Sequence, residues 1–266
     1  MADERGRVTI EEGVVFGSGG GRELACDVFT PPGGAKDAPS VLIIHGGGWR
    51  DGDRSQLRAY GLRLGREGYV CVATEYRLTP EAPWPAQIED VKAAIRWMGA
   101  NSDELGLDPD RIAVEGNSAG AHLALLAAGT PGLAEFEGEG GNAGVSTAVA
   151  AAIAIYPPTD FTVGVGGGRV LVGDAGDEVA RLASPVTHIG PDFPPTLLIH
   201  GNADETVDPE QSLLMYRALD DLGVPVELHM YAGQPHAFDA EPAFARQCAD
   251  VMRLFLTRYV PSAVTA

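Results

Sequence analysis

A chain of 266 residues, 45% of them hydrophobic, is long enough for one large α/β domain or two small ones. Its formal net charge of −18 argues against nucleic-acid partners, whose phosphates it would repel, and against anionic membrane surfaces. Its apolar runs are shorter than the roughly 20 residues needed to cross a bilayer, and its charged N-terminus predicts no signal peptide. We therefore expect a cytoplasmic protein that binds neither nucleic acid nor membranes.

The three cysteines, Cys26, Cys71 and Cys248, lie far apart in the sequence. An odd number of dispersed cysteines favours buried free thiols in a reducing compartment over a disulfide framework. The sequence also lacks a Cys-x-x-Cys motif and any Cys and His cluster with metal-ligand spacing. We expect neither a metal nor another cofactor.

The N-terminal half predicts a β-hairpin followed by alternating strands and helices. Apolar and β-branched residues indicate strands at 8–16 and 22–29, and the glycines between them indicate a turn. Short continuous runs of apolar residues predict further buried strands at 41–44, 69–73 and 111–114. Apolar residues at helical spacing predict helices near 57–64, 85–100 and 121–128.

The C-terminal half continues this alternation. We expect a loop at 129–146, and a long irregular segment at 157–195 with a short helix near 177–182. Asp208 is the predicted N-cap of a helix that extends to residue 222, with Pro209 at its first position. The remaining predicted elements are strands at 149–156, 196–200 and 224–231, and a final helix whose apolar face holds Phe244, Cys248, Val251, Phe255 and Tyr259.

This alternation predicts a mainly parallel sheet with helices on both faces, in a single domain over residues 1–266. In such a sheet, functional groups gather beyond the carboxyl ends of the strands. The distance of each polar residue from a strand end therefore helps to select the candidates.

The most informative run is the G-x-S-x-G motif, in which a predicted strand leads into Ser118 and a helical stretch follows. This order of strand, tight turn and helix is the context in which such a serine acts as a nucleophile. The turn is so sharp that the flanking residues must be small. The motif reads Gly116-Asn117-Ser118-Ala119-Gly120.

A serine hydroxyl needs a base, and His236 is the best candidate among the six histidines. It lies in the loop that leaves the last predicted strand, so it can reach back to Ser118. His122 follows the serine on its own helix and is expected to point away from a substrate. His229 lies within the last strand, where its side chain is expected to meet the layer that covers the sheet.

An acid must orient the histidine, and Asp204 lies four residues beyond the strand that ends at His200. Glu205 lies one step further into the loop, and Asp208 already has a sufficient role as a helix cap. Asp160 is a second candidate, with an alternative role as a turn residue. The predicted order Ser118, Asp204, His236 is the chain order of α/β-hydrolase triads.

The oxyanion that forms in acyl transfer needs backbone N–H donors. The strand at 41–44 runs into three glycines, which let the backbone approach a substrate closely. The predicted donors are the N–H groups of Gly47, Gly48 and Ala119. His45 is expected to hydrogen-bond to nearby backbone and hold this loop in shape. The loop reads His45-Gly46-Gly47-Gly48-Trp49.

Together these motifs resemble the α/β-hydrolase superfamily, specifically esterases with an HGGG oxyanion motif. These include bacterial hormone-sensitive-lipase-like carboxylesterases and feruloyl and acetyl esterases. The resemblance spans about residues 41–238 and implies an eight-stranded, mainly parallel sheet with an N-terminal antiparallel hairpin. Only about 40 residues precede the HGGG strand, so we expect a small or minimal cap, with residues 157–195 forming a lid.

Two positions depart from the lipase-like pattern. Asn117 stands where those enzymes commonly carry Asp, and Gly120-Ala121-His122 follows Ser118-Ala119 where they commonly carry Gly-Gly. The second departure looks more like kynurenine formamidases and the smaller esterases. An arylformamidase that acts on N-formylkynurenine is therefore an alternative.

The resemblance implies a serine carboxylesterase for small or short-acyl esters. Besides the formamidase, the alternatives are a non-catalytic receptor with a hydrolase fold and a serine peptidase of related fold. The expected partner is a small-molecule ester; the oligomeric state stays open, with a homodimer among the alternatives. Five residues are candidate substrate contacts, although core packing is the commoner fate of such aromatic residues: Trp49, Asn117, Tyr156, Phe161 and Phe238.

Overall fold

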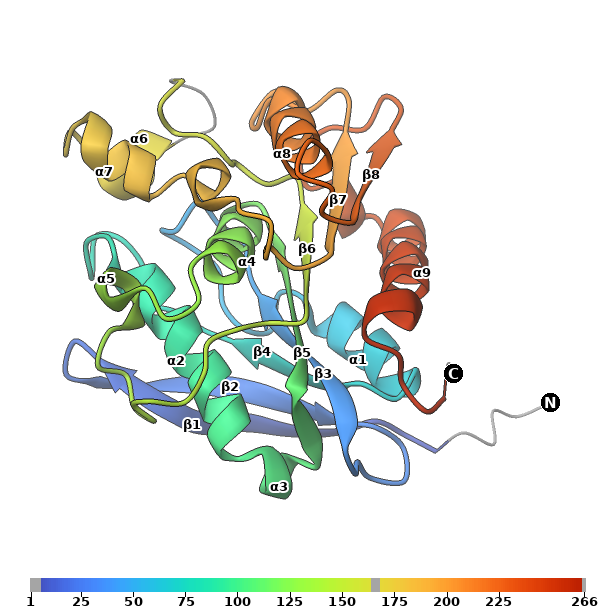
Figure 1. Cartoon of the computed structure of the whole chain (residues 1–266). Helices are drawn as coiled ribbons and strands as arrows, with labels where there is room; N and C mark the ends of the chain where they lie inside the picture. The colour runs from blue at the N-terminus through green and yellow to red at the C-terminus, as the bar shows by residue number, and fades with distance from the viewer. Residues whose placement is uncertain (1–5, 164–167, 265–266) are drawn as a thin grey trace.

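The computed structural model describes residues 6–163 and 168–264, which form one eight-stranded sheet with the order β1-β2-β4-β3-β5-β6-β7-β8 (Figure 1). β1 pairs antiparallel with β2 and β2 pairs antiparallel with β4, whereas all the other neighbours are parallel. The expected α/β fold with an N-terminal hairpin is confirmed. The strands are β1 (Thr9–Gly19), β2 (Arg22–Thr30), β3 (Ala38–Ile44), β4 (Val70–Thr74), β5 (Leu107–Asn117), β6 (Ala151–Ile155), β7 (Thr196–Gly201) and β8 (Val226–Tyr231).

Helices cover both faces of the sheet, as expected (Figure 1). α2, α4 and α8 pack on one face, and α1 and α9 on the other. The α-helices are α1 (Arg58–Arg66), α2 (Ala86–Ala100), α3 (Ser102–Leu105), α4 (Ala119–Gly129), α5 (Ala134–Glu137), α6 (Gly168–Val172), α7 (Asp177–Leu182), α8 (Glu210–Asp220) and α9 (Pro242–Tyr259), and the 3₁₀ helices are η1 (Pro185–His188) and η2 (Phe238–Ala240).

Side-chain alternation in the central strands separates two apolar layers. In β3, Leu42 and Ile44 belong to the layer beneath α2 and α4, whereas Val41 and Ile43 belong to the layer beneath α1 and α9. Successive side chains of a strand point to opposite faces, so a strand covered on both faces needs a continuous apolar run. This is why the central strands could be recognised from short apolar runs.

Several element ends differ from the sequence expectation. β1 continues to Gly19, because Gly20 and Gly21 both adopt positive φ and close the hairpin in two residues. α8 begins at Glu210, two residues after the expected cap, but Asp208 Oδ1 still accepts the Glu210 N–H at 2.9 Å.

α5 lies within the predicted loop at 129–146, and distant residues hold it in place. Lys92 and Arg96 of α2 both form ion pairs with Glu137, at 2.9 and 2.8 Å. A helix of four residues has little stability of its own, so tertiary contacts decide whether it forms. Such contacts leave no local periodic signal in the sequence.

The described residues contain no helix long and apolar enough to cross a membrane. Within these same residues, no group of three or more His, Cys, Asp or Glu side chains could hold a metal ion. Cys26, Cys71 and Cys248 are buried free thiols.

Glu115 is a buried carboxyl in the middle of the sheet. It lies on β5, its side chain is inaccessible to solvent, and neither carboxyl oxygen has a hydrogen-bond partner in residues 6–163 and 168–264. Burial, with a smaller contribution from the nearby Asp239, raises the pKa of Glu115 well above its usual range. The folded chain therefore holds this carboxyl protonated where the unfolded chain would ionise it.

Replacing Glu115 with Gln should stabilise the protein at pH 8 more than at pH 5. Above the unfolded pKa of about 4.3, folding of the wild type must take up a proton, so its free energy of unfolding falls as the pH rises. Urea denaturation at both pH values measures the difference. The exposed Glu104→Gln should show an equal effect at both pH values, and an equal effect for Glu115→Gln would contradict the prediction.

Candidate active site

The G-x-S-x-G run forms the predicted strand, turn and helix. β5 ends at Asn117, α4 begins at Ala119, and Ser118 between them has φ of +53°. Residues other than glycine rarely adopt a positive φ, so the backbone of Ser118 is strained and must be held by the surrounding structure. A Cβ on Gly120 would lie 2.0 Å from the Ile44 carbonyl oxygen, so only glycine lets the helix start approach β3 this closely.

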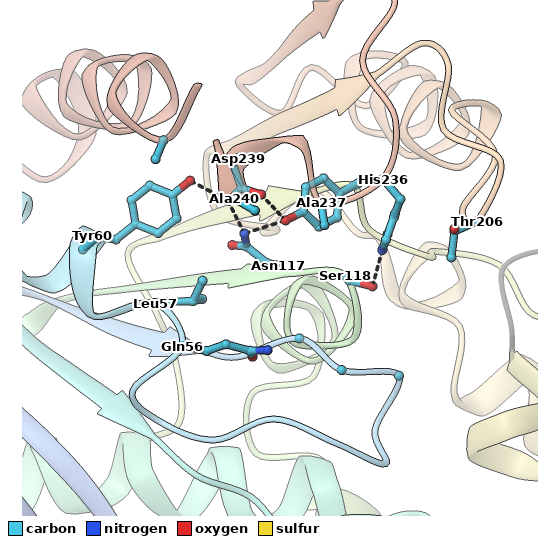
Figure 2. Close-up of a pocket in the computed structure, with 16 residues that line it drawn as sticks. Gln56, Leu57, Tyr60, Asn117, Ser118, Thr206, His236, Ala237, Asp239 and Ala240 are labelled. Atoms are coloured by element: carbon cyan, nitrogen blue, oxygen red, sulfur yellow. Dashed lines mark hydrogen bonds between the residues drawn. The ribbon is translucent and has the colours of Figure 1, made fainter. Parts of the chain in front are cut away.

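The structure brings Ser118, His236 and Asp204 into one hydrogen-bonded chain. His236 Nε2 lies 3.0 Å from Ser118 Oγ (Figure 2), and His236 Nδ1 lies 2.7 Å from Asp204 Oδ2. A carboxylate only accepts, so Nδ1 carries the ring proton and donates it to Asp204. Nε2 of the neutral ring is then free to accept the serine proton. This is the geometry that general-base activation of a serine requires.

Asp204 has a second histidine partner, His200, that the sequence reasoning missed. His200 Nε2 lies 3.2 Å from Asp204 Oδ2 and 3.1 Å from the Val207 carbonyl oxygen. Because a carbonyl only accepts, His200 Nε2 carries a proton, and Nδ1 accepts the Ser212 hydroxyl at 2.7 Å. The available signal was a histidine at a strand end, four residues before the selected acid.

The environment of Asp204 keeps it ionised. Burial alone would raise the pKa of this carboxyl, but hydrogen bonds from His200, from His236 and from the Val207 N–H hold it below its usual range. The N–H groups of Thr206 and Val207 both donate to Oδ1, at 2.8 and 2.9 Å. A fixed negative charge therefore faces His236.

The other acid and base candidates have different partners. Asp160 Oδ1 accepts both the N–H and the hydroxyl of Thr162, which is the turn role considered above. Both ring nitrogens of His122 have partners other than Ser118: Nε2 lies 2.7 Å from the Ala183 carbonyl oxygen, and Nδ1 accepts the Trp49 Nε1–H. His229 lies on the edge strand β8, where its half-exposed side chain lines a surface pocket with residues of the covering helix α9, and its Nε2 lies 3.6 Å from Glu227 Oε2.

The glycine loop after β3 is held by its first residue. His45 Nδ1 lies 2.7 Å from the Gly46 carbonyl oxygen, and the His45 ring stacks on Tyr76 at 4.3 Å. Burial lowers the pKa of His45, so the ring is neutral and its N–H donates to that carbonyl. Within residues 6–163 and 168–264, the N–H groups of Gly47, Gly48 and Ala119 donate to no protein acceptor.

A sequence model of the BD-FAE family matches residues 26–219, which is most of the chain. The chain belongs to the BD-FAE family. Esterase LipQ of Mycobacterium tuberculosis is 34% identical to it over 258 residues, which cover 89% of this chain and 60% of LipQ. The matched part of this chain covers between half and three fifths of the length of these curated relatives; for LipM of the same organism the share is 50%.

Solved esterase structures have the same fold as this BD-FAE chain. A Thermogutta terrifontis esterase superposes with a TM-score of 0.84 at 26% identity, covering 96% of this chain and 94% of that one. A truncated carbohydrate esterase from gut microbiota superposes with a TM-score of 0.79 at 25% identity, covering 93% and 99%. Other structures of the Thermogutta enzyme hold butyrate, or are phosphorylated by paraoxon. The resemblance to α/β-hydrolase esterases is confirmed.

A cavity of about 490 Å³ opens beside Ser118 in this BD-FAE chain (Figure 2). The glycine loop, the start of α1, Ser118 itself and the His236 loop form its walls. Two of the predicted substrate contacts, Asn117 and Tyr156, line this cavity.

The other three predicted contacts are buried and do not line this cavity. Trp49 Nε1 donates to His122 Nδ1 at 3.3 Å, and Phe161 stacks on the same ring at 4.9 Å. Phe238 packs against Tyr231, with ring centroids 4.9 Å apart. Trp49, Phe161 and Phe238 thus pack against other aromatic rings outside this cavity, and their role as substrate contacts stays a prediction.

Replacing Asp204 with Asn should lower the free energy of unfolding at pH 7, and this loss should shrink in acid. The lowered folded pKa makes the ionised carboxylate stabilising above its unfolded pKa of about 3.9, and this contribution is lost as the pH falls through the folded value. Urea denaturation at pH 7, 4 and 3 measures the loss. Asp103→Asn, at an exposed carboxylate, provides the control; a loss for Asp204→Asn that is constant with pH would refute the assignment.

Proposed function

We propose that the protein is a serine carboxylesterase that hydrolyses small or short-acyl esters through an acyl-enzyme. The observation that carries this proposal is the chain from Ser118 Oγ to His236 to Asp204, with contacts of 3.0 and 2.7 Å. It lies beside a loop whose N–H groups have no protein acceptor in the described residues. The names of LipQ and of the Thermogutta enzyme support an ester as the substrate.

In the acylation step, Ser118 Oγ attacks the carbonyl carbon of the ester while its proton moves to His236 Nε2. Asp204 stabilises the imidazolium that forms. The carbonyl oxygen becomes an oxyanion that accepts hydrogen bonds from the N–H groups of Gly47, Gly48 and Ala119. When the tetrahedral intermediate collapses, the C–O bond breaks and the alcohol leaves with the proton from His236.

Water reverses these roles in the deacylation step. His236 Nε2 takes a proton from the water as the water oxygen attacks the acyl carbon. This addition forms a second tetrahedral intermediate with an oxyanion. Collapse of this intermediate breaks the bond to Ser118 Oγ, which regains its proton from His236. The products are a carboxylic acid, an alcohol and the free enzyme.

This proposal also includes a preference for esters with small acyl groups. The cavity beside Ser118 has the volume of a small-ligand site. The propionate and butyrate in structures of the Thermogutta enzyme are short acids of the kind expected as products. A rate series over acyl chain length, including acetyl and feruloyl sugars, tests this preference.

The arylformamidase is the second candidate, because residues Ala121 and His122 favour it and the same atoms would cleave a formamide. Comparing rates on N-formylkynurenine with rates on short esters decides between the two. A non-catalytic receptor is disfavoured by the complete hydrogen-bonded chain at Ser118. The cytoplasmic location, a lid at 157–195 and a homodimer stay predictions.

Replacing Ser118 with Ala should abolish ester hydrolysis, because the acyl-enzyme can no longer form. We expect kcat on p-nitrophenyl acetate to fall by roughly 10⁴-fold or more. Labelling by a fluorophosphonate should disappear as well. The exposed Ser146→Ala should keep both properties, and turnover retained by Ser118→Ala would disprove the nucleophile.

The two glycines of the oxyanion loop should differ in their response to alanine. A Cβ on Gly47 would lie 2.0 Å from the Asp51 carbonyl oxygen, whereas a Cβ on Gly48 meets open space. Gly47→Ala should therefore shift the N–H donors and lower kcat by about 10²–10³-fold. Gly48→Ala displaces no protein atom, so it should lower kcat less than Gly47→Ala does, with a cost of about 1–2 kcal/mol of stability for the positive φ. Equal losses of kcat in the two variants would contradict this reading of the loop.

A further inference from the structure

The cavity beside Ser118 has one wall formed by a hydrogen-bonded cluster around Asp239, a residue that the sequence reasoning did not single out. Asp239 lies in η2, three residues after His236, and is almost entirely buried. Its carboxylate accepts hydrogen bonds from Tyr60, Tyr156 and Asn117 (Figure 2). Tyr60 Oη and Asn117 Nδ2 lie 2.7 and 2.6 Å from Oδ2.

This cluster joins the segment that carries the nucleophile to the segment that carries the base. Asn117 directly precedes Ser118, and its Nδ2 donates both to Asp239 Oδ2 and to Tyr156 Oη, the latter at 2.8 Å. Tyr156 Oη in turn donates to Asp239 Oδ1. Residues 117 and 239 are thus connected by a route that does not pass through the Ser118–His236 hydrogen bond.

Tyr156 has a special place in this route, because it contacts the base as well. Its ring centroid lies 4.6 Å from that of His236. Tyr156 directly follows the last residue of β6. Its φ is +44°, which is a strained backbone conformation for a residue other than glycine. Burial and the neighbouring Asp239 raise the pKa of Tyr156 well above its usual range, so the hydroxyl keeps its proton and donates.

Asn117 and Tyr156 therefore donate their side-chain hydrogens within the protein, whereas the buried Asn117 Oδ1 has no partner in the described residues. Both amide hydrogens of Asn117 are donated to the cluster, and the hydroxyl hydrogen of Tyr156 is donated to Asp239. This arrangement leaves neither side chain a hydrogen to offer to an ester. We therefore consider whether these side chains position the catalytic residues instead of binding the ester.

We propose that Tyr156 is a positioning residue for His236, acting through the hydrogen bonds that it shares with Asn117 and Asp239. The proposal rests on the proposed esterase function. In the acyl-enzyme Ser118 Oγ has lost its hydrogen, so the direct hydrogen bond to His236 is absent. The Asp204–His236 hydrogen bond and the Tyr156 route remain, and together they hold His236 in place to activate water. Loss of the Tyr156 hydroxyl should therefore slow deacylation more than acylation.

The test compares Tyr156→Phe with Tyr60→Phe. Each variant removes one hydroxyl that donates to Asp239, but Tyr60 makes no hydrogen bond to Asn117 and no ring contact with His236 in the described residues. Tyr156→Phe should lower kcat on p-nitrophenyl acetate by roughly tenfold or more, with a smaller change in kcat/KM, since kcat/KM reports acylation. A burst of p-nitrophenol should precede the slow turnover. Tyr60→Phe should lower kcat less than Tyr156→Phe does and should give no larger burst than the wild type, because Tyr60 makes no ring contact with His236.

The outcomes separate this inference from the proposed function. If the wild type hydrolyses no ester, the proposed function fails. If the wild type is active and both variants keep its kcat, or lose it equally without a burst, the positioning role is refuted. Should Tyr156→Phe not fold, Asn117→Ala interrupts the same route and is expected to give the same burst. In the double variant the two losses should be less than additive, because both remove one route.

Discussion

The close approach of the start of α4 to the end of β3 is the constraint on which the site depends. Gly120 lies against the Ile44 carbonyl oxygen with no room for a Cβ. This contact brings the nucleophile at the end of β5 and the glycine loop at the end of β3 to adjacent positions. Ser118 and the N–H groups of Gly47 and Gly48 can face one substrate because Gly120, which has no Cβ, tolerates this close approach.

Much of the fold could be predicted because its central strands are covered on both faces. A strand such as β3 must then be apolar at every position, and this is visible as a short continuous run. The order of strands and helices places Ser118, Asp204 and His236 just beyond the carboxyl ends of β5, β7 and β8, on the same side of the sheet. Their residue types and positions were therefore readable, and the structure brings them together.

The parts that could not be predicted depend on contacts between distant segments. Asp239 and His200 acquire their roles from partners that the fold brings close, such as Tyr60 and Ser212. The aromatic Phe238 could not be distinguished from a pocket residue, because burial in a core and in a pocket select the same side chains. α5 is held by the ion pairs of Lys92 and Arg96 with Glu137 and by the buried Phe136.

Two histidines contact backbone carbonyl oxygens of the segment around α7. His122 contacts the Ala183 carbonyl oxygen at 2.7 Å, and His188 contacts that of Leu182 at 2.8 Å. A carbonyl is present at every position of a chain, so these anchors place little demand on which side chains occupy the segment. The exposed side chains of α7, such as Glu178 and Arg181, can therefore change without loss of these two contacts. The surface of this segment can vary in this way while Ala183 stays packed in the core.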